Sequence, residues 1–190
     1  ASVKIYDSLS AEVLNLTMPV TTQPLTSEKI VTLDSLRGTI FLDLKLLSSD
    51  GKEVATNFYW LNGKPDVPDW DKTTWAYTPM KSYTSFEQLN YLQQTEVKLN
   101  HQLQMNGDKY ELKGQLINVS DKIAFMLDIS LTNEKGETII PAFWSDNYFS
   151  LMPGEEREIS CSLPSAAVEN KSIKLNLNSW NTRAMRFDVK

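Results

Sequence analysis

The sequence has 190 residues and a formal net charge of -5. Its lysines and arginines are scattered and form no continuous basic stripe, so we do not expect a nucleic-acid partner. The longest apolar runs, such as residues 39–47, contain charged residues and fall far short of the roughly 20 residues that a membrane helix needs. We therefore expect no insertion into a membrane.

The first part of the chain predicts a small set of strands. Residues 49–52 (SDGK) give a strong hairpin signal between the last two of them. Five strands are few for a self-sufficient sandwich, and no lead-in precedes the first. We therefore expect a partial immunoglobulin-like β-sandwich, truncated at its N-terminus. The expected strands are 3–6, 12–16, 29–33, 39–47 and 53–61.

Residues 62–91 combine prolines with several tryptophans and tyrosines. Disordered linkers are poor in aromatic residues, so this segment is expected to wrap over a surface and pack its rings between two sandwiches. Ser85 and Gln88 have the spacing of a capping box, which predicts one or two helical turns over residues 85–92. No other helix of consequence is expected.

From residue 95 onward, apolar and polar residues alternate with a period of two, which is typical of half-buried strands. Six to eight short strands at this spacing predict an immunoglobulin-like sandwich of about 95 residues. The fold class is therefore all-β, with a partial sandwich and aromatic segment over 1–84 and a C-terminal sandwich over 85–190. The clearest expected strands are 97–105, 125–131, 159–163, 173–177 and 185–189.

Cysteine and histidine offer little chemistry. Cys161 is the only cysteine, so no intrachain disulfide can form, and it shares its strand parity with Ile159 and Leu163. This pattern predicts a buried and inert thiol. His101 is the only histidine and occupies an inward strand position, which favours a packed ring over a general base.

The acidic residues also favour structural interpretations. Glu134 follows Asn133, as the acid/base glutamate of barrel glycosidases follows an asparagine, but it stands in an expected hairpin tip that is open to water. Asp66, Asp69 and Asp71 are interrupted by prolines and lack the distant glutamate of a calcium loop. We therefore expect no catalytic residue, no metal site and no cofactor.

A cluster late in the chain is the best candidate for binding carbohydrate. Aromatic faces stack on sugar rings, while Asp and Asn accept hydrogen bonds from hydroxyl groups. The alternative is that Trp144 plugs the sandwich while the two polar residues shape a turn. Trp60, within the run FYWL, is expected to lie in the core. The candidate binding residues are Trp144, Asp146, Asn147 and Tyr148.

Several motifs carry a resemblance to a known family. Read in order, they resemble the carboxyl-terminal region of family 2 glycoside hydrolases, closest to the exo-β-D-glucosaminidase branch, with β-mannosidase-type enzymes near it. The motifs are GKEV (51–54), NFYWL (57–61), DW (69–70), WAYTP (75–79), LN (89–90), LINVS (116–120), IPAFWSDN (140–147), SLMPGE (150–155) and SWNT (179–182).

The resemblance implies a non-catalytic region of a larger enzyme. In that family the catalytic glutamates lie on an upstream (β/α)8 barrel, which would be the partner of this chain within one polypeptide. The parent would be a periplasmic or extracellular retaining exo-glycosidase that removes terminal β-linked glucosamine or mannose, with any export signal upstream. Two alternatives stay open: a carbohydrate-binding module with an aromatic platform, and an adhesion or receptor module unrelated to sugars.

Overall fold

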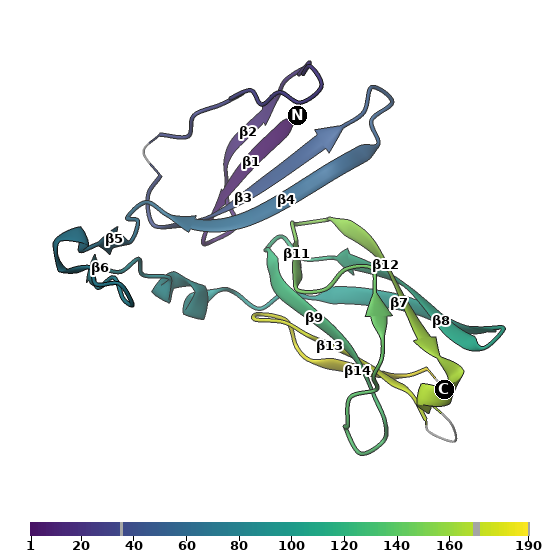
Figure 1. Ribbon diagram of the computed structural model, residues 1–190. Coiled ribbons are helices and arrows are strands. Elements are labelled where there is room, and N and C mark those ends of the chain that lie inside the picture. Colours follow the sequence, from purple (N-terminus) through teal and green to yellow (C-terminus); the bar gives the residue numbers. More distant parts are fainter. Residues whose placement is uncertain (35, 169–171, 190) are drawn as a thin grey trace. The chain divides into compact units, whose positions relative to one another are not determined.

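The protein is all-β, as predicted (Figure 1). The computed structural model describes residues 1–34, 36–168 and 172–189. The chain divides into two compact units, Ala1–Leu92 and Gln93–Lys190. Its described helices are three short 3-10 helices, and none of them is long or apolar enough to cross a membrane.

The first unit is built on one antiparallel sheet with strand order β2-β1-β3-β4. The residues 49–52 close the β3–β4 hairpin, as the turn signal predicted. Four of the five predicted strands are confirmed. They are β1 (Ser2–Asp7), β2 (Glu12–Thr17), β3 (Thr39–Leu47) and β4 (Glu53–Asn62).

One face of this sheet forms a small core around Val3, Ile5, Ile40 and Leu42. The irregular segment between β2 and β3 covers this face with the partly buried side chains of Val31, Leu33 and Leu36. The prediction of a strand over residues 29–33 is therefore wrong. Apolar side chains at alternate positions pack on the sheet there, but their backbone joins no strand.

The opposite face of the same sheet is aromatic. Phe41 is buried and stacks on Phe58, with ring centroids 5.9 Å apart. Trp60 lies opposite Phe41 in the ladder but is 39% exposed, so the prediction that it lies in the core is wrong. Since the first five residues of β3 are all buried, this strand buries side chains on both faces.

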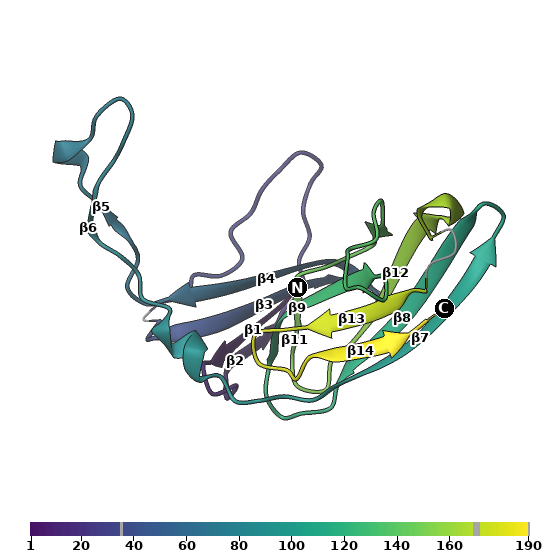
Figure 2. The same ribbon diagram turned by 90° about the horizontal axis from the view of Figure 1, so that it is seen from below.

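Residues 62–84, which we call the aromatic arm, begin at the last residue of β4. The arm contains β5 (Val67–Pro68), the 3-10 helix η1 (Trp70–Lys72) and β6 (Met80–Ser82). Strands β5 and β6 pair only with each other, as a two-stranded sheet apart from the four-stranded one (Figure 2). The helix η2 (Glu87–Tyr91) confirms the helical turn predicted over residues 85–92.

The second unit is a sandwich of two antiparallel four-stranded sheets, β10-β12-β8-β7 and β11-β9-β13-β14. This architecture confirms the predicted immunoglobulin-like fold. The 3-10 helix η3 (Ser165–Val168) follows β12. The strands are β7 (Val97–Asn106), β8 (Lys109–Asn118), β9 (Ala124–Thr132), β10 (Phe143–Trp144), β11 (Phe149–Leu151), β12 (Glu156–Pro164), β13 (Lys174–Asn178) and β14 (Met185–Asp188).

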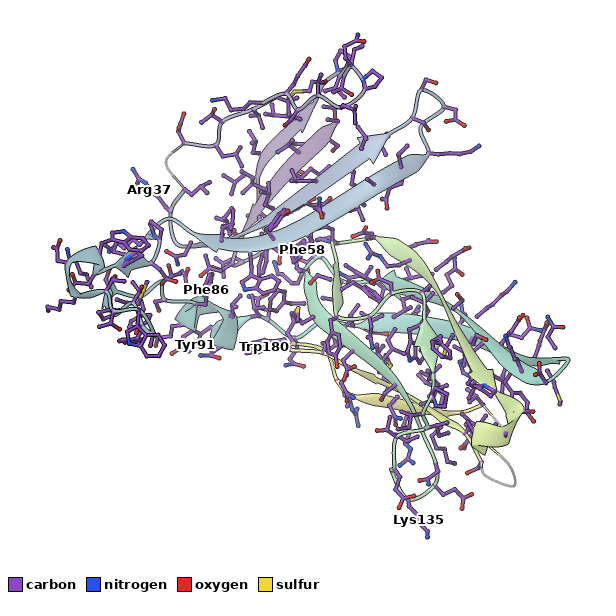
Figure 3. The ribbon with its side chains drawn as sticks, viewed as in Figure 1. Arg37, Phe58, Phe86, Tyr91, Lys135 and Trp180 are labelled. Carbon is purple, nitrogen blue, oxygen red and sulfur yellow. The ribbon has the colours of Figure 1, made fainter. Side chains whose placement is uncertain are left out.

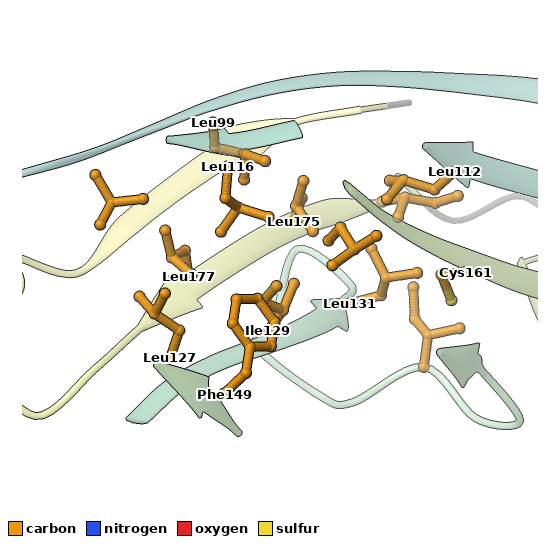
Figure 4. Packing of buried hydrophobic residues seen from close by; sticks show 14 of the residues in the cluster. Leu99, Leu112, Leu116, Leu127, Ile129, Leu131, Phe149, Cys161, Leu175 and Leu177 are labelled. Carbon is orange, nitrogen blue, oxygen red and sulfur yellow. The ribbon is translucent and has the colours of Figure 1, made fainter. Parts of the chain in front are cut away.

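Inward residues of the two sheets interdigitate in one apolar cluster (Figure 4). They occupy the alternate strand positions that the period of two predicted. Most are fully buried, so their removal from water is the main stabilising term of the sandwich. Representative members are Leu99, Leu112, Leu116, Leu127, Ile129, Leu131, Cys161, Leu175 and Leu177.

Two buried asparagines satisfy backbone groups of the sandwich. Asn118, at the end of β8, is fully buried, and its Nδ2 donates to the carbonyl oxygens of Lys122, Leu151 and Met152 at 2.7 to 3.1 Å. Because buried backbone oxygens need a donor, this amide replaces water that the fold excludes.

Asn181 plays the same role between β13 and β14. Its Nδ2 donates to the carbonyl oxygens of Gln93 and Ile123, both at 2.8 Å, and its Oδ1 accepts the N–H of Phe125 at 2.9 Å. One side chain thus ties the start of the unit, the entry to β9 and the β13–β14 connection together.

Candidate functional site

The predicted carbohydrate-binding residues lie where the chain crosses between the two sheets of the sandwich. Strand β10 ends at Trp144 and pairs with β12, while β11 begins at Phe149 and pairs with β9. Residues 145–148 form the crossing. The structure therefore brings the four candidates together in one short segment.

Trp144 belongs largely to the fold. It lies opposite Cys161 in the β10–β12 ladder, and its partly buried ring packs against the apolar cluster of the sandwich. Next to it, Ser145 N–H donates to Ser160 O and Ser145 Oγ accepts Ser160 N–H, both at 2.8 Å. These bonds extend the pairing of β10 past the tryptophan.

Asp146 is paired with a cation inside the unit. Its Oδ2 lies 2.8 Å from Arg157 Nη1, and its Oδ1 accepts the N–H of Asn147 at 2.9 Å. The same guanidinium lies 3.7 Å from Glu155 Oε1 and 4.8 Å from the centroid of the Phe149 ring. Arg157 therefore holds two carboxylates and a ring in place.

Asn147 pairs with β9 through its side chain as a strand would. Its Oδ1 accepts the N–H of Ile129 at 2.8 Å, and its Nδ2 donates to Ile129 O at 2.9 Å. Its Oδ1 also accepts the N–H of Tyr148. The amide thus completes the β9 ladder where β11 has not yet begun.

Tyr148 is the candidate that faces solvent. It has a positive φ of 57°, and its side chain is 62% exposed. Phe143, which the sequence argument did not select, is 66% exposed on the adjacent strand. Carbohydrate binding by this segment stays a prediction, which calorimetry with chitosan and mannan oligosaccharides and the Trp144→Ala variant would test.

The other titratable side chains behave as the sequence predicted. The His101 ring packs against Phe187, with centroids 5.1 Å apart. Cys161 is 2% exposed, and burial raises the pKa of its thiol to about 12. A thiol that stays protonated at neutral pH is a poor nucleophile. The predicted buried thiol and packed imidazole ring are confirmed.

Glu134 is exposed at the β9 hairpin tip, next to Lys135, as predicted (Figure 3). Asn133 Oδ1 fixes that turn by accepting the N–H groups of Lys135 and Glu137 at 2.9 and 3.0 Å. Within residues 1–34, 36–168 and 172–189, no group of three His, Cys, Asp or Glu side chains could hold a metal ion.

The aromatic arm leaves most of its rings uncovered by the rest of the first unit, and their packing between two sandwiches stays a prediction. Tryptophan-rich composition alone does not tell which way a ring points, whereas short strands beside prolines indicate a projecting hairpin. The exposed fractions are 71% for Trp70, 100% for Trp75, 63% for Tyr77 and 72% for Tyr83.

The fold of the second unit defines a class: an immunoglobulin-fold β-sandwich. The family described as the exo-β-D-glucosaminidase Ig-fold domain matches residues 75–182. The chain belongs to this family, which confirms the resemblance inferred from its motifs.

Relatives agree with this assignment. The exo-β-D-glucosaminidase of Arthroderma benhamiae is 31% identical over 87% of the chain, and that of Streptomyces avermitilis is 30% identical over 77%. A structure of the Amycolatopsis orientalis exo-chitosanase CsxA, in complex with PNP-β-D-glucosamine, covers 98% of the chain at 26% identity and a TM-score of 0.86. The chain spans 18% and 17% of the two curated relatives and 23% of the exo-chitosanase.

Proposed function

We propose that this chain is the non-catalytic accessory region of a longer retaining exo-β-glycosidase, which removes terminal β-linked glucosamine and whose catalytic barrel lies elsewhere in the same polypeptide. The observation that carries the proposal is the family match over residues 75–182, in a chain that spans only 18% of an exo-β-D-glucosaminidase. The names of the relatives favour glucosamine over mannose as the sugar.

The side-chain chemistry supports a structural role. Glycoside hydrolysis needs two carboxyl groups facing each other across the scissile bond, about 5 to 10 Å apart. The carboxylates of Asp146 and Glu155 do converge, but on the guanidinium of Arg157, which fills the space between them with an ion pair. The sandwich then contributes rigidity and surface to its parent.

The test compares the parent polypeptide with this chain alone on aryl β-glucosaminide and β-mannoside substrates. The parent should hydrolyse the glucosaminide faster, and the chain alone should hydrolyse neither. Turnover by the chain alone that disappears in the Glu134→Gln variant would overturn the proposal. A parent that prefers the mannoside would correct the sugar.

We also propose that the parent is exported to the periplasm or the exterior. The support is the family resemblance alone. Activity measured separately in the culture medium, periplasmic extract and cytoplasm of the source cells tests it, and activity confined to the cytoplasm would contradict it.

A further inference from the structure

The aromatic arm reverses the usual relation between burial and polarity. The structure describes all of residues 62–84, and the one buried residue among them is charged: Asp69 is 7% exposed. The arm's large rings are exposed instead, and Trp75 has an exposed fraction of 100%. Burial of its own apolar groups therefore does not stabilise the arm in this chain.

Polar bonds nevertheless give the arm a defined shape. Asp69 N–H donates to Pro79 O at 2.7 Å, and the Asp69 carboxylate lies 3.4 Å from Lys72 Nζ and 3.6 Å from Lys81 Nζ. At the tip, Thr74 N–H donates to Tyr77 O at 2.8 Å. The rings are thus displayed by a folded loop.

Exposed aromatic side chains on a folded loop are typical of an interaction surface. Contiguous exposed apolar patches on soluble proteins mark binding sites, and Trp and Tyr are enriched at the centres of protein interfaces. Each such ring can bury about 150–250 Å², so the arm's Trp70, Trp75, Tyr77 and Tyr83 together approach the roughly 800 Å² that one partner contributes to a standard interface.

The arm's carboxylates favour a protein over a saccharide as the occupant. Asp71 Oδ2 lies 3.5 Å from Lys81 Nζ, Asp69 is held by the two lysines, and Asp66 Oδ1 accepts the N–H of Thr84 at 2.6 Å. A sugar would meet rings beside two acids that are already engaged, Asp66 and Asp69, and one whose side chain is 89% exposed, Asp71. A protein surface needs mainly apolar contact there, which the rings supply.

We propose that the aromatic arm is the docking element through which this region binds the catalytic barrel of its own polypeptide. The inference rests on the proposed function, under which most of the parent lies outside this chain, since the chain spans 18% of its Arthroderma benhamiae relative. A partner tethered in the same polypeptide is present at a high effective concentration, so a modest patch is enough to hold it.

Hydrogen–deuterium exchange of residues 67–82 tests the proposal, measured in the full parent and in this chain alone. The amides of Asp69 and Thr74 should exchange at least about tenfold more slowly in the parent, because the docked barrel suppresses local opening of the arm. Equal exchange in the two proteins would overturn the proposal.

Substitution separates docking from folding. The double variant Trp70→Ala/Trp75→Ala should speed arm exchange in the parent and leave the chain alone unchanged. Phe143→Ala, which removes a ring of similar exposure from the second unit, should change arm exchange in neither protein. An equal effect of the double variant in both proteins would show a role in local folding and would overturn docking.

Other occupants have their own readouts on the chain alone. Protection of the arm by added chitosan oligosaccharides would assign the rings to sugar, and concentration-dependent protection with dimer formation in sedimentation would assign them to a second copy. Either result overturns the proposal. Glycosidase activity of the parent is measured separately, so a failure of docking is distinguishable from a failure of the proposed function.

Discussion

The two units bury their apolar residues by different means. In the second, two sheets face each other, and both surfaces of the core are regular strands with paired backbones. In the first, one sheet is covered by an irregular segment whose side chains pack without a backbone ladder, as Val31 and Leu33 show. A segment that packs on a sheet without backbone hydrogen bonds to a strand unfolds locally more easily. We therefore expect the first unit to be the less stable one.

The largest expected effect comes from the sandwich core. Leu116 is fully buried between the sheets, so Leu116→Ala should lower the free energy of unfolding of the second unit by about 3–5 kcal/mol. In the first unit, Leu42→Ala should cost less, about 2–3 kcal/mol, because the irregular cover can collapse into the space. Urea titration followed by hydrogen exchange resolves the two units. Equal losses would contradict the proposed difference between them.

The second effect concerns the buried side-chain amide of Asn181 in the second unit. Asn181→Ala should destabilise the second unit by about 2–4 kcal/mol, since it leaves buried backbone groups of Ile123 and Phe125, and a partly buried one of Gln93, without this partner. Asn100→Ala, at an exposed outward position of β7, is the control and should change stability by less than about 0.5 kcal/mol. Thermal unfolding measures both, and a loss below about 1 kcal/mol for Asn181→Ala would refute this role of the amide.

The third effect tests side-chain packing between neighbouring strands of one sheet, since β7, β8 and β12 are adjacent in it. A Cβ at Gly114 would lie 3.0 Å from Ile159 Cγ1 and 3.3 Å from Leu99 Cδ1. Gly114→Ala should therefore cost about 1–3 kcal/mol through overpacking. Adding Ile159→Val should recover part of that loss in a double-mutant cycle. Strict additivity of the two substitutions would show that the cost arises elsewhere.

The fourth effect depends on pH. Burial raises the pKa of the Cys161 thiol from 9.0 to about 12, so the folded thiol keeps its proton where the unfolded one loses it. Stability from this source is complete below pH 9 and decreases as pH rises from 9 to 12, by about 1 kcal/mol at pH 10. The wild type should lose this much relative to Cys161→Ala. Parallel pH profiles for the two proteins would contradict the raised pKa.

The smallest effect is expected at the crossing between the sheets. Asp146→Asn removes the charge from a partly exposed pair with Arg157, so it should cost less than about 1 kcal/mol and less still at high salt. Chemical unfolding at low and high ionic strength measures it. A loss that does not change with salt would assign the contribution to hydrogen bonding rather than to charge.

The sequence predicted strands best where one face is buried and the other is wet. Strands β7, β9 and β12 alternate cleanly for this reason, because each presents one surface to the core and one to solvent. Strand β8 did not stand out as a separate alternating run, since its inward series is interrupted by Gly114, which lies between two larger inward leucines. The alternation over residues 29–33 led to a wrong strand prediction, because a segment whose apolar side chains pack on a sheet can show the same alternating pattern as a strand.

The sequence could predict which residues of the candidate site lie close together, but not which groups they bind. The sequence placed an aromatic and two polar residues together, and its structural alternative for Asp146 and Asn147, the shaping of a turn, describes the bonds that they make. Spacing could not reveal that the partners would be Arg157 and the backbone of Ile129. On short strands beside turns, the alternation of apolar and polar residues likewise does not predict which side chains are exposed. The exposed rings of the aromatic arm show this.

The burial of Asn118 has a consequence for producing this protein. Residues 118–120 (NVS) match the acceptor pattern for N-linked glycans, which attach to the asparagine Nδ2. In the fold that same nitrogen donates to three carbonyl oxygens in a space closed to solvent. A glycan added during passage through a eukaryotic secretory pathway would thus prevent the sandwich from closing. A bacterial host, or a Ser120→Ala variant in yeast that removes the acceptor pattern and keeps the Asn118 amide, is therefore the sounder route to folded material.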